Sequence, residues 1–165
     1  MKALVKAKAE RGIWMENVPE PEIGMNDVLI RVLRTAICGT DLHIYQWNEW
    51  AAKTIPVPMV VGHEFVGEIA EVGSNVRDFR VGDRVSIYWL HSACGRCKYC
   101  LSGRENYCPQ IQCTGWDRDG GYAEYVRIPA YNFCPFDPSV GSDQMAVLPD
   151  AVATSYHALK TMGQV

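Results

Sequence analysis

The sequence predicts a mainly β protein, built as a compact, partly open β-barrel with one helix near its C-terminus. Three observations favour this fold. Short runs of apolar and β-branched residues recur along the chain, and turns that contain glycine or proline separate them. A sustained helical pattern occurs only near the end. No Gly-x-Gly-x-x-Gly motif lies between a strand and a helix, so a nucleotide-binding Rossmann domain is not expected within this sequence.

The expected strands are short and spread over the chain, at residues 2–7, 12–18, 28–33, 65–72, 84–87 and 122–128. The run 28–33 is continuous and branched, which predicts a strand buried on both faces. Residues 40–45 predict a short helix whose cap is Thr40 or Asp41. The stretch 47–58 is expected to be irregular, because its prolines keep it extended.

The C-terminal part is expected to be helical from Ser142. Pro149 is expected to interrupt this helix, because proline lacks the N–H that the preceding turn requires. The helix then resumes from Ala151 through Met162. If Pro149 takes the first position of the second helix, Asp150 lies in that helix's first turn.

Composition and charge exclude several classes of function. The chain has 165 residues, of which 48% are hydrophobic and 21% charged, as expected of one globular domain. A net charge of −3 and the lack of a basic run argue against a nucleic-acid partner. The N-terminus has no signal-peptide core, and no apolar run reaches membrane-spanning length. We therefore expect a cytoplasmic protein without a membrane partner.

Four of the seven cysteines are clustered, which in such a protein predicts a metal site rather than disulfides. They are Cys94, Cys97, Cys100 and Cys108. The Cys-x-x-Cys spacings let the loop turn back around one ion, and four thiolates fill the tetrahedral sphere of zinc, so such a site is structural. Two other interpretations stay open on the residues alone. One is four unrelated thiols, and the other is an iron–sulfur centre, although Cys108 lies too far along for the bacterial ferredoxin spacing.

A second candidate site combines side chains that lie far apart in the sequence. Cys38, His63, Glu64 and Asp150 offer a thiol, an imidazole and two carboxylates, a ligand set for zinc with an open position. Spacing alone does not prove that they meet, and a lone histidine is more often an ordinary polar residue. On residue chemistry, a second metal and a set of unrelated polar residues are both open.

Several motifs resemble the medium-chain dehydrogenase/reductase superfamily, in particular its GroES-like catalytic domain. Cys38-Gly39-Thr40-Asp41-Leu42-His43 with Gly62-His63-Glu64-Phe65-Val66-Gly67 is similar to its zinc signature. The cysteine lobe, Val81-Gly82-Asp83-Arg84-Val85 and Gly120-Gly121-Tyr122-Ala123-Glu124-Tyr125 also match it. Residues 1–85 resemble L-threonine 3-dehydrogenases most, whereas residues 89–116 are more similar to yeast-type and bacterial alcohol dehydrogenases.

The resemblance implies roles for individual residues. The ligands of a catalytic zinc would be Cys38, His63, Asp150 and, as an intermittent or outer ligand, Glu64. Thr40 would take the proton of the substrate hydroxyl, and His43 would pass it outward. The four clustered thiolates would hold a structural zinc, which makes two zinc ions per chain.

The resemblance also implies a domain organisation. Residues 1–150 would form the GroES-like catalytic domain, including the zinc lobe at 91–113. Residues 151–165 would begin the helix that leads to a Rossmann domain absent from this chain, and that domain would bind NAD or NADP. The full-length form is expected to be a homo-oligomer.

The expected function is that of a zinc-dependent, NAD(P)-linked dehydrogenase acting on a small secondary alcohol, with L-threonine oxidised to 2-amino-3-oxobutanoate as the first choice. A general alcohol or polyol dehydrogenase, with butanediol-like or sorbitol-like substrates, is the alternative enzyme. A free-standing, zinc-stabilised binding module without turnover is the alternative outside enzymes. Without a cofactor domain, the chain alone is expected to be inactive.

Overall fold

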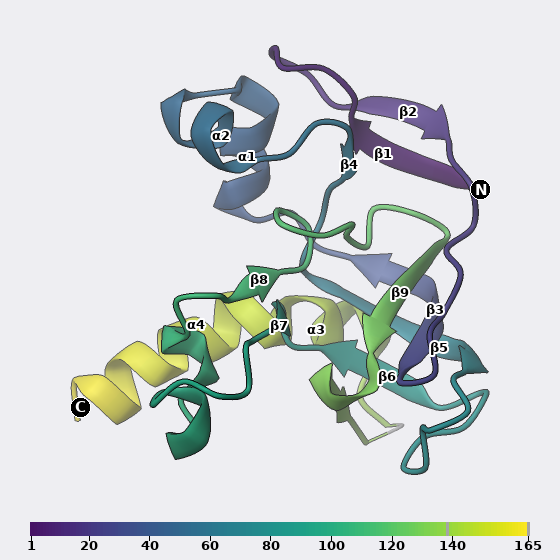
Figure 1. Cartoon of the computed structure of the whole chain (residues 1–165), viewed down its shortest axis with the longest axis vertical. Helices are drawn as coiled ribbons and strands as arrows, with labels where there is room; N and C mark the ends of the chain where they lie inside the picture. Colours follow the sequence, from purple (N-terminus) through teal and green to yellow (C-terminus); the bar gives the residue numbers. More distant parts are fainter. Residues whose placement is uncertain (138, 165) are drawn as a thin grey trace.

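Three antiparallel sheets, of five, three and two strands, and a helical C-terminal arm (Ser142–Met162) make up the computed structural model, which describes residues 1–137 and 139–164 (Figure 1). The strands are β1 (Lys2–Lys6), β2 (Trp14–Asn17), β3 (Asp27–Thr35), β4 (Met59–Val60), β5 (Phe65–Val72), β6 (Arg84–Ile87), β7 (Leu90–Ser92), β8 (Gln112–Cys113), β9 (Tyr125–Pro129) and β10 (Phe133–Pro135). The α-helices are α1 (Gly39–Gln46), α2 (Glu49–Thr54), α3 (Ser142–Val147) and α4 (Ala153–Tyr156). The 3-10 turns are η1 (Cys100–Ser102), η2 (Glu105–Tyr107) and η3 (Ala130–Asn132), and the π-helical turns are η4 (Leu148–Val152) and η5 (His157–Met162).

The largest sheet, in the order β10-β6-β5-β3-β9, carries the main hydrophobic core. Its central strand β3 pairs antiparallel with β5 on one side and β9 on the other. Eight buried side chains form the core: Val28, Ile30, Phe65, Ile69, Val85, Ile87, Val126 and Ile128. The prediction that 28–33 is buried on both faces is wrong beyond Ile30. Arg31 is exposed and pairs with Glu68 on β5 at 3.3 Å. At this position, one face of β3 is therefore open to solvent.

The three-stranded sheet has the order β2-β1-β4 and lies beside the largest one (Figure 1). Residues 120–124 link the two sheets. The carbonyl of Tyr122 accepts the N–H of Leu4 on β1 (2.7 Å), and the carbonyl of Glu124 accepts the N–H of Val32 on β3 (3.0 Å). This linkage completes a sheet-rich, partly open barrel, as the sequence predicts.

Most predicted strands are found with small shifts at their ends. The hairpin expected around Gly12 is confirmed, since β1 pairs antiparallel with β2. The strand expected at 65–72 is β5, and the one at 84–87 is β6. The strand expected at 122–128 begins only at Tyr125, because the backbone before it already bonds to both sheets.

Helix α1 begins one residue earlier than predicted and uses a different cap. The N-cap is Cys38, whose backbone is extended (φ −98°, ψ 162°), rather than Thr40 or Asp41. The Asp41 carboxylate, three residues on, accepts the backbone N–H of Cys38 at 2.8 Å. The helix start is thus built from the residue expected to ligate a metal.

Helix α2 corrects the prediction that residues 47–58 are irregular. The side-chain oxygen of Asn48 accepts the backbone N–H of Ala51 at 3.0 Å, which caps the helix. Glu49 and Lys53 then pair one turn apart on its exposed side. The downstream prolines end this helix and do not prevent it.

Lys6 is fully buried and holds the β1–β2 turn against the end of α1. Its ammonium donates to the carbonyl of Gly12 at 2.9 Å and to that of Glu10, and lies 4.5 Å from the ring centroid of Trp47. Burial lowers the pKa of Lys6. Trp47 is the left-handed C-cap of α1 (φ 55°), so Lys6 fixes the end of this helix.

The C-terminal arm follows one helical path from Ser142 to Met162, so the predicted interruption at Pro149 is wrong. Pro149 lies in the wider π-helical turn η4, where the N–H of Ala153 reaches the carbonyl of Leu148. This wider turn accommodates a residue without an N–H donor. Asp150 lies in the first turn of η4. No helix in the described part of the chain is both long and apolar enough to span a membrane.

Candidate metal centres

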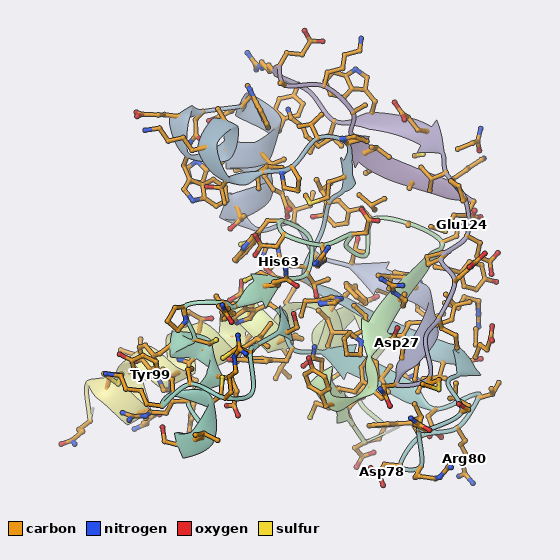
Figure 2. All side chains as sticks on the ribbon, viewed as in Figure 1. Asp27, His63, Asp78, Arg80, Tyr99 and Glu124 are labelled. Atoms are coloured by element: carbon orange, nitrogen blue, oxygen red, sulfur yellow. The ribbon has the colours of Figure 1, made fainter. Side chains whose placement is uncertain are left out.

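Four side chains from three separate segments meet at one point between the sheets. Cys38 comes from the start of α1, His63 and Glu64 from the loop before β5, and Asp150 from the C-terminal arm. One potential ligand atom of each lies within 4.8 Å of all the others. Figure 2 shows His63 at the junction of the two sheets. The predicted convergence of these residues is therefore present in the fold.

The distances within this cluster fit a tetrahedral zinc ion. His63 Nε2 lies 3.2 Å from Asp150 Oδ2, and Cys38 Sγ lies 3.8 Å from the same oxygen. Zinc bond lengths of about 2.0–2.3 Å place N···O pairs at about 3.4 Å and S···O pairs at about 3.6 Å around a tetrahedron. Glu64 Oε2 is buried without a hydrogen-bond partner and is thus available as a further ligand.

Burial makes the cluster an unfavourable place for three negative charges without a cation. His63 and Glu64 are only 1% and 2% exposed. Desolvation, followed by the nearby carboxylates, raises the pKa of Cys38. Desolvation and the charge of Asp150 also raise the pKa of Glu64, whereas the hydrogen bond from His63 lowers the pKa of Asp150. A divalent cation would compensate these buried charges.

Asp41 lies beside His63, and Tyr122 contacts Asp41; the sequence did not indicate either residue as part of this site. Asp41 is 4% exposed, and its Oδ1 lies 4.0 Å from His63 Nδ1. Both atoms are buried without a hydrogen-bond partner. Asp41 Oδ2 accepts a hydrogen bond from the Tyr122 hydroxyl at 2.7 Å. The position of Asp41 three residues after Cys38, as in a capping box, was the available signal for it; Tyr122 gave none.

Thr40 and His43 lie on α1, three residues apart, and therefore on the same side of the helix. Thr40 Oγ1 is 3.8 Å from Cys38 Sγ, at the edge of the cluster. His43 is exposed, and its Nδ1 lies 2.8 Å from the side-chain nitrogen of Asn48. The two residues thus lead from the cluster toward solvent.

Aromatic rings form a wall beside the cluster. The ring of Trp116 lies 5.3 Å from that of His63, with Trp89 stacked on it at 5.9 Å and Trp50 edge-on at 6.4 Å. Trp50 thus belongs to this wall. Trp47 packs instead with the core near α1 and α2. Trp116 is a further residue near the cluster that the sequence did not indicate, because it is 53 positions from His63.

The four clustered cysteines form a second centre in the lobe between β7 and β8. Their sulfur atoms lie within 4.8 Å of one another, with Cys97 and Cys100 at 3.5 Å and Cys94 and Cys100 at 3.9 Å. Tetrahedral zinc with bonds of about 2.3 Å places sulfur atoms about 3.8 Å apart. Backbone N–H groups of Arg96 and Cys97 lower the pKa of Cys94 to about 6, so this thiolate forms readily.

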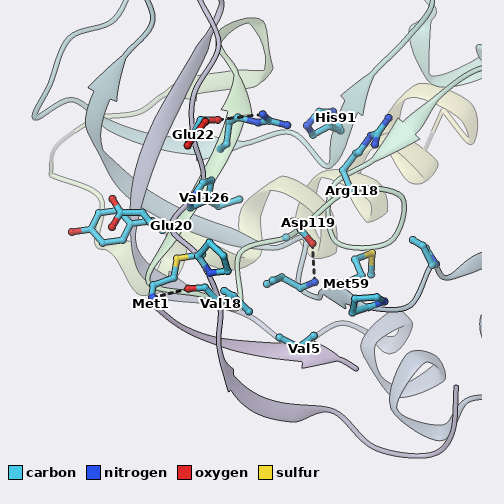
Figure 3. Close-up of a pocket in the computed structure, with 18 of the residues that line it drawn as sticks. Met1, Val5, Val18, Glu20, Glu22, Met59, His91, Arg118, Asp119 and Val126 are labelled. Atoms are coloured by element: carbon cyan, nitrogen blue, oxygen red, sulfur yellow. Dashed lines mark hydrogen bonds between the residues drawn. The ribbon is translucent and has the colours of Figure 1, made fainter. Parts of the chain in front are cut away.

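A separate cavity lies between β1, the segment after β2 and β9 (Figure 3). It encloses about 640 Å³, and its lining includes His91, Arg118 and Arg127. None of the candidate metal ligands lines it. His91 is partly buried there, and desolvation and the two arginines lower its pKa.

Comparison with known proteins decides the family. A family model described as the alcohol dehydrogenase GroES-like domain matches residues 24–138. The chain belongs to this alcohol dehydrogenase family. Residues 38–43 and 62–67 and the cysteine lobe all fall within the matched range, as the resemblance of the motifs implies.

Curated relatives of this alcohol dehydrogenase domain include L-threonine 3-dehydrogenases. That of Yersinia enterocolitica is 51% identical over 157 residues, which are 95% of this chain and 46% of the relative. That of Rhizobium johnstonii is 54% identical over 157 residues, 95% of this chain and 45% of the relative. The chain thus spans about half the length of the curated relatives it matches.

Solved structures of alcohol dehydrogenases share the fold. Alcohol dehydrogenase TADH from Thermus sp. ATN1 superposes with a TM-score of 0.86 at 32% identity and covers 99% of this chain and 48% of its own. The short chain alcohol dehydrogenase rspB from E. coli CFT073, complexed with NADH, gives 0.79 at 34% identity and covers 90% and 41%. The described residues of this chain contain no doubly wound parallel sheet.

Proposed function

We propose that this chain is the catalytic domain of a zinc-dependent, nicotinamide-linked dehydrogenase that oxidises a secondary alcohol, with L-threonine as the substrate. The observation that carries the proposal is the convergence of Cys38, His63, Glu64 and Asp150 on one point. Residues 1–150 would form this domain, and 151–165 the start of the helix that leads out of it. The relatives named threonine dehydrogenases support the choice of substrate.

The chain's own residues provide a soft thiolate, a neutral imidazole and carboxylates for the metal. Cys38, His63 and Asp150 are assigned as ligands, and Glu64 as an intermittent or outer one. Zinc held by these residues would supply a Lewis acid that lowers the pKa of an alcohol hydroxyl. The buried position of His63 and Glu64 keeps bulk water away from this side of the site.

The proton of the substrate hydroxyl needs a route to solvent, and α1 offers one. We assign Thr40 Oγ1 to accept this proton, because a hydroxyl both accepts and donates. His43, one turn further out, is assigned to pass it on, since an imidazole titrates near neutral pH. The alcohol carbon then gives up a hydride, with its two electrons, and the product is a ketone. A nicotinamide, NAD or NADP, held by the remaining half of the full-length protein would accept the hydride.

The tryptophan wall would border a bound substrate. Trp116 lies beside His63, and Trp50 lies edge-on to Trp116. The cysteine lobe is assigned a second, structural zinc, which would fill its sphere with four thiolates and leave no position for substrate. Two zinc ions per chain follow from these assignments, and a homo-oligomer is proposed for the full-length protein.

The first test is a metal count on the purified chain. Two zinc ions per chain are expected, and one should be lost in both Cys38→Ser and His63→Ala. A count of one zinc ion that survives these substitutions would remove the catalytic centre from the proposal. The same result, without turnover, would favour a zinc-stabilised binding module.

The second test addresses the substrate. The chain replaces the matching N-terminal part of the Yersinia enterocolitica relative, and reduction of NAD⁺ and NADP⁺ is followed with L-threonine and with 2,3-butanediol. Turnover of L-threonine, abolished by Cys38→Ser, is expected. Turnover of the diol alone would replace threonine by a general alcohol or polyol substrate. The unmodified relative serves as the control for assembly.

A further inference from the structure

We propose that Tyr122 is a positioning residue of the Cys38–His63 centre, acting through Asp41. The inference rests on the proposed function, since it requires a metal ion at this centre. Tyr122 lies in the segment that links the two sheets, and its side chain reaches both segments that carry these two ligands. Three groups of contacts support this role.

The first contacts are those of the hydroxyl. Tyr122 Oη lies 2.7 Å from Asp41 Oδ2 and 2.8 Å from the carbonyl oxygen of Ala36. Both acceptors flank Cys38, one in the turn before it and one on α1 after it. A phenol has one proton to donate, and the charged carboxylate is the stronger acceptor. The hydroxyl therefore fixes Asp41 relative to the backbone that leads into Cys38.

The second contacts are those of the ring and backbone. A Cβ atom at Gly62 would lie 2.3 Å from Cδ1 of Tyr122, so the ring lies directly against the residue before His63. The N–H of Tyr122 also donates to the carbonyl of Val61 at 2.9 Å. The same residue is thus in contact with the segment that carries His63.

The third observation is the direction of the Asp41 carboxylate. Its Oδ2 accepts from the N–H of Cys38 and from the Tyr122 hydroxyl. This leaves Oδ1 facing His63 Nδ1 at 4.0 Å, beyond hydrogen-bond distance, and both atoms are buried without a hydrogen-bond partner, so a small rotation of the imidazole would join them. An imidazole that donates from Nδ1 to a carboxylate presents its Nε2 lone pair to a metal. Tyr122 thereby sets the orientation of the group that orients His63.

The test is the zinc affinity of the full chain, measured by competition with a chromophoric chelator, in wild type and Tyr122→Phe. This substitution keeps the ring against Gly62 and removes only the hydroxyl. Groups that orient a metal-ligating histidine contribute about 10–100-fold to affinity. We expect a loss of about 5–10-fold in Tyr122→Phe, which acts one step further out. Zinc affinity of the cysteine lobe, in the same molecules, should not change.

Cobalt absorption spectra and a double-mutant cycle of Tyr122 and Asp41 separate positioning of the metal ligands from general destabilisation of the fold. Cobalt replaces zinc, and the absorption bands that disappear in Cys38→Ser belong to this centre; Tyr122→Phe should shift them. Asp41→Asn should weaken zinc binding at least as much, and the double substitution no further. Tyr131→Phe is the matched control, because it removes a hydroxyl that donates to the carbonyl of His91, away from the centre.

The outcomes are distinguishable. If wild type binds no zinc through Cys38, the proposed function and this inference both fail. If wild type binds it and Tyr122→Phe matches wild type in affinity and cobalt bands, the role of Tyr122 alone is overturned. Equal weakening of both metal centres, with a lower melting temperature, also overturns it. If Tyr122→Phe does not fold, Asp41→Asn decides, and unchanged zinc affinity there overturns the inference.

Discussion

Gly62 is the residue whose replacement should most directly disturb the Cys38–His63 centre without removing a ligand. Its φ of +99° is one that residues with a side chain rarely adopt. A Cβ atom there would lie 2.3, 2.7 and 2.7 Å from three ring carbons of Tyr122. Gly62→Ala is therefore expected to strain the backbone and to displace either Tyr122 or His63.

The expected loss in the free energy of unfolding of Gly62→Ala has two parts. Holding alanine in a left-handed conformation costs about 1–2 kcal/mol. Forcing a methyl group into a packed site costs about 1–3 kcal/mol. The total of about 2–5 kcal/mol is a large part of the roughly 5–15 kcal/mol that stabilises a typical domain. For a chain of this size, the melting temperature should fall by roughly 10 °C.

Gly82→Ala is the matched control. Gly82 has a similar φ of +92°, but a Cβ atom there would have no neighbour within 4 Å. Gly82→Ala should show only the cost of the left-handed backbone, and its melting temperature should fall by roughly 5 °C. Both variants are melted with saturating zinc and followed by far-ultraviolet circular dichroism, and zinc affinity is measured in parallel.

Only Gly62→Ala is expected to weaken zinc binding at the Cys38–His63 centre. The reasoning is refuted if the two variants melt at the same temperature, because the contact with Tyr122 would then carry no cost. An unchanged zinc affinity in Gly62→Ala would separately refute the link between this contact and the position of His63.

Two further predictions concern other parts of the chain. Cys100→Ser should remove one zinc ion per chain and speed proteolysis within residues 94–108, because metal binding and folding of the lobe are coupled. Cys113→Ser is the control, and equal cleavage of the two variants would contradict the prediction. Burial lowers the pKa of His91 below 6.5, so the folded state takes up its proton at lower pH than the unfolded state does. The unfolded state then binds more protons below pH 6.5, and stability falls as the pH drops through that value. His91→Gln should therefore lose less melting temperature than wild type between pH 7.5 and 5; equal losses would show that His91 does not titrate in this way.

Local patterns made much of this fold predictable. The strand at 65–72 and the hairpin around Gly12 follow from periodicity and turn residues, which act over a few positions. The Cys-x-x-Cys spacing predicts the lobe for the same reason. Helix α2 was also predictable, since Asn48 is a good cap and Glu49 pairs with Lys53. The downstream prolines led to the prediction of an irregular segment instead.

Long-range contacts explain what could not be predicted. Tyr122 and Asp41 are 81 positions apart and meet only because residues 120–124 run between the two sheets. The continuous path of the arm past Pro149 depends on a π-helical turn, which residue preferences do not forecast. The approach of Asp150 to His63 depends in turn on that path; the sequence favoured it only through the resemblance.

The candidate metal ligands come from two parts of the molecule, the barrel and the C-terminal arm. Cys38, His63 and Glu64 belong to the barrel, whereas Asp150 belongs to the arm, whose residues 151–162 are all exposed. An ion bound by both would join the arm to the barrel. The angle at which the arm leaves the barrel would then depend on the side chains proposed to hold the metal.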